Sequence, residues 1–381
     1  MPKRFHTTIF FLTICYSAFS QQFETIPKNI FTGRKPLEFG QILCTTKGTV
    51  LIANSNDLSE IDHMEMHISN QYGEVIRDSK GKEQFVGKNS NIFKDMTESN
   101  AGIKLLCEGP GQSIFVVDAN NNFGCLAYKY ESGIMLPPFN FNEYSISKKN
   151  ITAIWISDDS DLYVATDVDT IYIINKAGRL FYEDPNGKIK ITYVNGIDRD
   201  SNFIPLQGAR TIKKVSLGNG IMAYTFAQST DDKRVILIGT NHGLIAYDKR
   251  TGQTINYLDN KNQKVTVTHI KSNVSESVIW FSTLEKGMGR LNTLAHSIHF
   301  FKYPKKEFAD STTYPIVNFS SKSSTEFFVA IADSLPAVFN IETGKYTFIN
   351  DTVFHETENK TTDIQCDGLG NLYITKGGGF Y

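Results

Sequence analysis

A short apolar motif recurs seven times along the chain, and this repeat restricts the fold more than any other feature. The motif is clearest as Ile-Leu-Ile-Gly-Thr at residues 236–240, and its relatives begin at residues 50, 114, 162, 279, 327 and 372. Successive starts therefore lie 64, 48, 74, 43, 48 and 45 residues apart. The basic period is in the mid-forties, with insertions in the first and third intervals.

The residues after the motif predict the other strands of each unit. Residues 243–257 contain a second apolar run, a turn at Thr251-Gly252 and a third run, and related segments occupy 288–303, 336–350 and 170–184. A period of 40 to 50 residues with about four strands is typical of propellers. We therefore predict an all-β fold, a seven-bladed β-propeller with four-stranded blades. The last blade is expected to be incomplete, because only residues 377–381 follow the seventh motif.

The N-terminus has the pattern of a secretory signal peptide. Lys3 and Arg4 precede an apolar run, and Ala18-Phe19-Ser20 fits a signal-peptidase site. We predict a signal peptide at residues 1–20 and the propeller at residues 21–381. The chain is then exported to the periplasmic or extracellular side. No later apolar run approaches the ~18 residues that span a bilayer, so we expect no membrane segment after cleavage.

Charge and cysteine content exclude some partners and scaffolds. The net charge of -1 gives no electrostatic basis for binding nucleic acid. Four cysteines follow the signal peptide, too few for a disulfide scaffold in a chain of this length. Free cysteine packs as a small apolar residue, so buried thiols are the favoured interpretation. The four residues are Cys44, Cys107, Cys125 and Cys366.

The clearest unit resembles the repeat of the two-component regulator propellers. The matching residues are Leu237–Thr240, Gly243-Leu244, Tyr247-Asp248 and Thr251-Gly252, and residues 279–292 are a second match with Trp280 at the aromatic position. The resemblance extends loosely over residues ~40–381.

This resemblance implies a periplasmic sensor of hybrid two-component or LytTR-type regulators of Bacteroidetes, many of which sense glycans. In that family two seven-bladed propellers precede a β-sandwich, a membrane helix and a kinase or DNA-binding output. The chain would correspond to the first propeller only, as the N-terminal part of a longer receptor. The resemblance also raises a homodimer formed through that longer receptor.

Candidate ligand-binding residues follow the motifs, where propeller loops gather on one face. Function collects on such loops, and their polar side chains could bind the hydroxyl groups of an oligosaccharide. Solvent exposure alone is the alternative for each of them, because loops are polar in general. The candidates are Asp167, Asp169, Asn241, His242, Glu285, Lys286 and Lys376.

The sequence carries no familiar catalytic pattern. It lacks GxSxG, HExxH, a P-loop and CxxC, so we predict no enzyme and no cofactor. His63, Glu65 and His67 would share one face of a strand and could bind zinc. A polar strand facing water is favoured over that metal site. Besides the sensor, two functions stay open: a secreted propeller enzyme acting on polysaccharide, and a scaffold that binds another protein.

Overall fold

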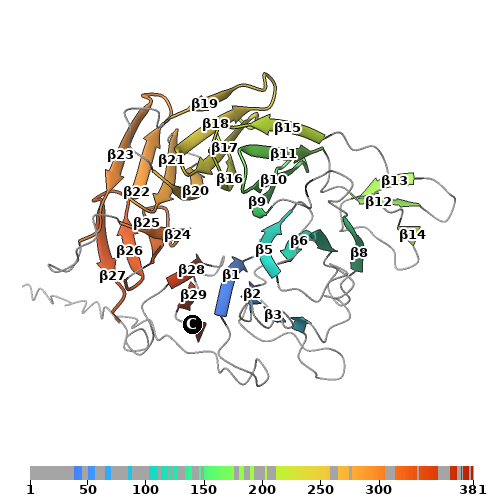
Figure 1. Cartoon of the computed structure of the whole chain (residues 1–381). Helices are drawn as coiled ribbons and strands as arrows, with labels where there is room; N and C mark the ends of the chain where they lie inside the picture. Colours follow the sequence, from blue (N-terminus) through green and yellow to red (C-terminus); the bar gives the residue numbers. More distant parts are fainter. Residues whose placement is uncertain are drawn as a thin grey trace, which may run out of the picture.

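The structure is a computed structural model, and the residues it describes are almost entirely in strands and short turns (Figure 1). The described residues are 38–44, 50–55, 65–69, 85–87, 103–109, 113–118, 121, 123–127, 134–139, 146, 150–175, 180–183, 189–192, 202–203, 212–257, 265–273, 277–304, 314–332, 334–350, 361–366, 370, 372–376 and 379–380. The predicted signal peptide and His63 lie outside these residues.

The first three four-stranded sheets come from the N-terminal half of the chain. One contains β1 (Glu38–Cys44), β2 (Val50–Ser55), β3 (Glu65–Ser69) and β4 (Phe85–Gly87). The next contains β5 (Ile103–Glu108), β6 (Ser113–Asp118), β7 (Phe123–Ala127) and β8 (Ile134–Phe139). The third contains β9 (Ile151–Ile156), β10 (Leu162–Thr166), β11 (Thr170–Ile174) and β15 (Ile212–Ser216).

Three more four-stranded sheets follow, and two further sheets have three described strands. The first contains β16 (Ala223–Gln228), β17 (Val235–Thr240), β18 (Gly243–Asp248) and β19 (Thr254–Asn256). The second contains β20 (Val267–Asn273), β21 (Val278–Thr283), β22 (Gly287–Asn292) and β23 (Ser297–Phe301). The third contains β24 (Ile316–Ser321), β25 (Glu326–Ile331), β26 (Ala337–Asn340) and β27 (Lys345–Phe348). The smaller sheets are β28 (Thr361–Cys366), β29 (Leu372–Lys376) and β30 (Gly379–Phe380), and β12 (Leu180–Glu183), β13 (Ile189–Thr192) and β14 (Asn202–Phe203).

The all-β prediction is confirmed for the described residues, and every motif forms the second strand of a sheet. These strands are β2, β6, β10, β17, β21, β25 and β29. All residues of β10 and β21 are buried. Both faces of such a strand pack against neighbouring sheets: Tyr163 of β10, for example, shares a core cluster with Phe226 and Ile236 of the following sheet. Burial on both faces explains why the motif is continuously apolar.

One predicted unit was wrong. The sequence predicts residues 170–184 to form two successive strands of a blade, but β11 pairs with β15, not with β12. β12 instead pairs with β13 and β14 in a separate sheet, whose strands lie between β11 and β15 along the chain. The insertion in the third interval thus interrupts a blade between its third and fourth strands. The pattern of apolar and polar residues within 170–184 could not predict this pairing, because the fourth strand, β15, follows the insertion.

The first strand of each motif-bearing sheet faces a common centre (Figure 1). These first strands are β1, β5, β9, β16, β20, β24 and β28. Each contacts the next along the sequence, and β28 also contacts β1. The side chains on the first strands are therefore the ones that can meet at the centre.

The cysteines and the membrane prediction are reported for the described residues only. Cys107 is a buried thiol, as predicted, whereas the thiols of Cys44 and Cys366 are only half-buried. The side chain of Cys125 lies outside the described residues. No helix in the described part is long and apolar enough to cross a membrane.

Candidate ligand-binding site

Each first strand has a β-bulge near its start, at the same register. In six strands one residue is left without a partner on the second strand, and these residues are Lys104, Thr152, Tyr224, Thr268, Val317 and Thr362. In β1 the register shifts between Phe39 and Ile42. A bulge re-aims side chains and often occurs beside a functional site. Here the bulge residues Thr152 and Thr268 each donate to a carbonyl of the next first strand.

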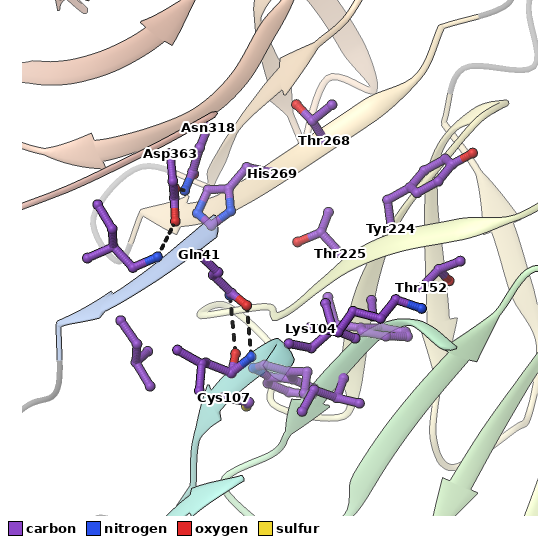
Figure 2. A pocket seen from close by; sticks show the side chains of 18 of the residues that line it. Gln41, Lys104, Cys107, Thr152, Tyr224, Thr225, Thr268, His269, Asn318 and Asp363 are labelled. Carbon is purple, nitrogen blue, oxygen red and sulfur yellow. Dashed lines mark hydrogen bonds between the residues drawn. The ribbon is translucent and has the colours of Figure 1, made fainter. Parts of the chain in front are cut away.

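A cavity of about 630 Å³ lies among the first strands (Figure 2). It is lined by residues from all seven of them, including the bulge residues of β5, β9, β16, β20 and β24. Gln41 of β1 also lines it, and so do the residues directly after the bulge residues of the other six strands: Leu105, Ala153, Thr225, His269, Asn318 and Asp363. The volume is within the range of small-molecule sites. This cavity is the candidate functional site.

Several polar groups of the cavity are used to join neighbouring first strands. The Gln41 side chain donates to the Leu106 carbonyl (3.2 Å) and accepts from the Leu106 amide (2.8 Å), as dashed lines show in Figure 2. The Thr152 hydroxyl donates to the Ala223 carbonyl at 2.7 Å, and the Thr268 hydroxyl donates to the Ile316 carbonyl at 2.7 Å. These groups hold the wall of the cavity together.

Asp363 on β28 connects three first strands. Its carboxylate accepts the Ile42 amide of β1 at 2.7 Å, the Asn318 side-chain amide of β24, and the Ile364 amide at 2.8 Å. Burial raises the pKa of Asp363 to about 6, against the lowering effect of these three hydrogen bonds. The carboxylate is thus enclosed by protein donors rather than turned toward a ligand.

His269 and Lys104 also line the cavity, and both have a lowered pKa. Burial is the main cause that lowers the pKa of His269 to about 4, and the charge of Lys271 adds to it. The imidazole is therefore neutral near pH 7, and it packs edge-on against Phe319 with ring centroids 5.2 Å apart. Burial also lowers the pKa of Lys104, whereas the charge of Asp167 acts in the opposite direction.

The β5–β9 side of the cavity also carries apolar side chains. Leu105, Ala153 and Trp155 line it, and the Trp155 ring lies 5.3 Å from the ring of Tyr163. Tyr163 in turn lies 5.9 Å from Phe226, another lining residue. The cavity therefore offers an apolar surface with an aromatic ring as well as hydrogen-bonding groups.

Six of the seven predicted loop residues lie in the turns between second and third strands, beside the starts of the first strands, whereas Lys376 is the last residue of β29. The Asp167 amide donates to the Asn150 carbonyl just before β9, and the Asn241 amide donates to the Met222 carbonyl just before β16. The Leu284 amide donates in the same way to Thr266 before β20. These turns therefore lie at the end of the sheets where the first strands begin.

Some of the predicted residues bind the protein itself. The buried Asn241 side chain accepts the Met222 amide at 2.9 Å and donates to the Gly220 carbonyl at 3.0 Å. The Glu285 carboxylate accepts the amide and hydroxyl of Thr266, at 2.7 and 2.9 Å. These contacts position the segments that enter β16 and β20.

The other predicted residues differ in exposure and in their relation to the cavity. Asp167 and His242 are exposed, Asp169 and Lys286 are half-buried, and the Lys376 side chain lies outside the described residues. None of the six residues whose side chains are described lines the cavity. Asp167 is connected to it through its charge, which acts on Lys104.

The residues that do line the cavity are not among the predicted ones, because every predicted residue follows a motif. They lie on the strand before it, where a polar residue directly precedes a buried apolar one: Thr225-Phe226, His269-Ile270, Asn318-Phe319 and Asp363-Ile364. Aligning the seven units upstream of the motif would have placed these polar residues in one column. That column is the signal that was available in the sequence.

The fold is similar to extracellular domains of bacterial sensors. The extracellular domain of a protein described as a hybrid two-component system, BT3049 of B. thetaiotaomicron, matches with a TM-score of 0.58 and 14% identity, over 92% of this chain and 40% of that one. Two structures of the extracellular domain of BT4673 from the same organism, described as a one-component and as a hybrid two-component system, match with TM-scores of 0.55 and 0.57. Their identities are 13% and 15%, over 94% of this chain.

These comparisons show the fold. The chain spans about 40% of the length of the matched structures. Its sequence matches no protein-family model and no curated protein.

Two residues of the zinc site that the sequence offered as an alternative lie in the described part of the chain. Glu65 and His67 lie on β3, the third strand of its sheet rather than an outer one. Among the described residues, no group of three or more His, Cys, Asp or Glu side chains could hold a metal ion.

Proposed function

We propose that the chain is a seven-bladed β-propeller that serves as the exported ligand-binding domain of a two-component signalling receptor. The seven motif-bearing sheets are its blades, and the contact of β28 with β1 brings the last blade to the first. Residues 1–20 are the signal peptide and residues 21–381 the propeller, the first one of a longer receptor. The similarity to extracellular domains of two-component systems supports this role.

The cavity among the first strands is the observation that carries the proposal. Every blade contributes to its wall, so a ligand bound there contacts the whole domain. We propose an oligosaccharide as the ligand. Sugars present hydroxyl groups at their edges and apolar C–H faces, and the cavity combines hydroxyl, amide and imidazole groups with Leu105 and Trp155.

Signal output is assigned to segments of the receptor outside this chain, and the chain itself is proposed to bind rather than to catalyse. A ligand changes such an output only if it binds two receptor conformations with different affinities. Dimerisation through the longer receptor would supply those two states. This proposal places the chain on the outer side of the membrane.

The test is a binding assay on the secreted chain with a panel of neutral and charged oligosaccharides. Isothermal titration calorimetry should give saturable binding of at least one compound, with one site per chain. Absence of binding throughout the panel at millimolar concentrations contradicts a sugar-binding sensor. Release of reducing ends from any polysaccharide by the pure protein would instead favour the secreted enzyme.

A further inference from the structure

Neighbouring first strands are joined by side-chain hydrogen bonds, with one exception. Gln41 joins β1 to β5, Lys104 of β5 donates to Asn150 just before β9, and Thr152 joins β9 to β16. Thr268 joins β20 to β24, and Asp363 joins β28 to both β24 and β1.

The exception is the junction of β16 with β20. The strands contact each other there, but no side-chain hydrogen bond connects them in the described part of the chain. Their contact is apolar instead, through Ala227, Val267 and Ile270. The polar residues at this junction are therefore not needed to hold the two strands together.

Three polar side chains line the cavity at this junction. Tyr224 is the bulge residue of β16 and Thr225 follows it, and His269 follows the bulge residue of β20 (Figure 2). Among the described residues none of their side-chain polar atoms has a hydrogen-bond partner, in contrast with Gln41, Thr152 and Asp363. These three side chains therefore have hydrogen-bonding capacity to spare at the cavity wall.

The position of Thr225 is fixed by its neighbours. An added Cβ on Gly239 would come within 2.5 Å of the Thr225 methyl carbon and within 2.8 Å of a Val267 methyl carbon. The glycine thus makes room for the Thr225 side chain against the second strand. A side chain held in this way loses less conformational entropy when a ligand binds.

We propose that Tyr224, Thr225 and His269 form the polar subsite of the cavity and that it takes a neutral ligand rich in hydroxyl groups. A phenol, an alcohol and a neutral imidazole can each donate and accept, which suits hydroxyl groups of either orientation. The charged groups that line the cavity lie on other first strands, Lys104 and Glu108 on β5 and Asp363 on β28. A phenol, an alcohol and a neutral imidazole offer no counter-charge to a carboxylate or ammonium group of the ligand, so such a group is disfavoured at this subsite.

This inference rests on the proposed binding function and is tested on the secreted chain with four trisaccharide probes. Cellotriose and maltotriose are neutral, trigalacturonate is an anion and the glucosamine trimer is a cation. The inference expects calorimetric binding of a neutral probe. Thr225→Val and His269→Phe should each weaken it about ten-fold, the effect of losing one or two hydrogen bonds.

Matched controls come from the outer strands of the same two sheets. Thr254→Val lies on β19 and His299→Phe on β23, and both residues are exposed. The controls should bind the neutral probe as tightly as the unaltered chain. Circular dichroism of all four variants checks that each is folded.

The outcomes separate the subsite from the proposed function. Neutral binding that Thr225→Val and His269→Phe weaken, and the controls do not, supports the subsite. If both variants bind as tightly as the unaltered chain, the subsite is overturned while the binding function stands. Binding of only the charged probes likewise overturns the subsite alone. If none of the four probes binds, the subsite is overturned and the sugar-binding function loses its support as well.

Discussion

Gly239, the glycine of the clearest motif, is required by packing rather than by backbone conformation. Its φ angle is not in the positive range, but an added Cβ would clash with both Thr225 and Val267. Gly239→Ala should therefore lower the free energy of unfolding by about 1–3 kcal/mol, the usual cost of overpacking. Urea denaturation followed by fluorescence measures this loss.

A second substitution tests whether this clash is the cause. Thr225→Ser removes the methyl carbon nearest to the added Cβ and keeps the hydroxyl. In the Gly239→Ala background it should restore part of the lost stability, and Val267 should account for the rest. No recovery in the double variant would show that the clash lies elsewhere.

Asp363 and His269 should give the stability of the protein opposite pH dependences. The folded pKa of Asp363 is about 6 against 3.8 for an ordinary aspartate, so the stability it adds is present below pH 3.8 and is lost as the pH rises through 6. The folded pKa of His269 is about 4 against 6.5, so its stability is present above pH 6.5 and is lost as the pH falls toward 4. Each effect is at most about 3 kcal/mol.

Two variants separate these effects. The stability difference between the unaltered chain and Asp363→Asn should shrink as the pH rises from 4.5 to 7. The difference for His269→Gln should grow over the same range. Urea denaturation at four pH values measures both differences. Parallel pH dependences for the two variants would contradict the opposite shifts of the two pKa values.

At the scale of the strand, the threonines that line the cavity differ in whether they bond to the next first strand. Thr152 and Thr268 donate to carbonyls of the next first strand, whereas Thr225 does not. Thr152→Val and Thr268→Val should each lower the free energy of unfolding by about 1 kcal/mol, because an acceptor loses its partner. Thr225→Val should stay within about 0.5 kcal/mol of the unaltered chain. Equal losses in all three would refute this division.

The strands themselves were largely predictable, whereas the cavity was not. All seven motifs are second strands because burial on both faces leaves a continuous apolar run, which is visible in one sequence. The pairing of β11 with β15 was missed, since an insertion separates the two strands. The bulges were missed too, because a bulge changes which side chains face the cavity without changing the apolar pattern. His269 looks like any polar residue of a strand until the seven units are aligned.

At the scale of the whole molecule, one carboxylate connects the two ends of the described chain. Asp363 of β28 accepts the Ile42 amide of β1, residues separated by 321 positions. The other contacts between first strands join sheets that are neighbours in sequence, whereas this hydrogen bond adds to the contacts of β1 with β28, β29 and β30. Asp363→Ala should therefore loosen the first and last sheets together, by leaving the buried Ile42 amide without its acceptor.

Hydrogen exchange followed by mass spectrometry measures this loosening sheet by sheet. In Asp363→Ala, peptides from β1 and from β28–β29 should lose protection together, while peptides from β20–β23 keep it, because local opening follows cooperative units. Asp158→Asn is the matched control, since its exposed pair with Lys233 contributes little. Loss of protection in β28–β29 alone would show that β1 is held by other contacts. Equal loss in every sheet would show that the domain opens as one unit, with no separate opening where its ends meet.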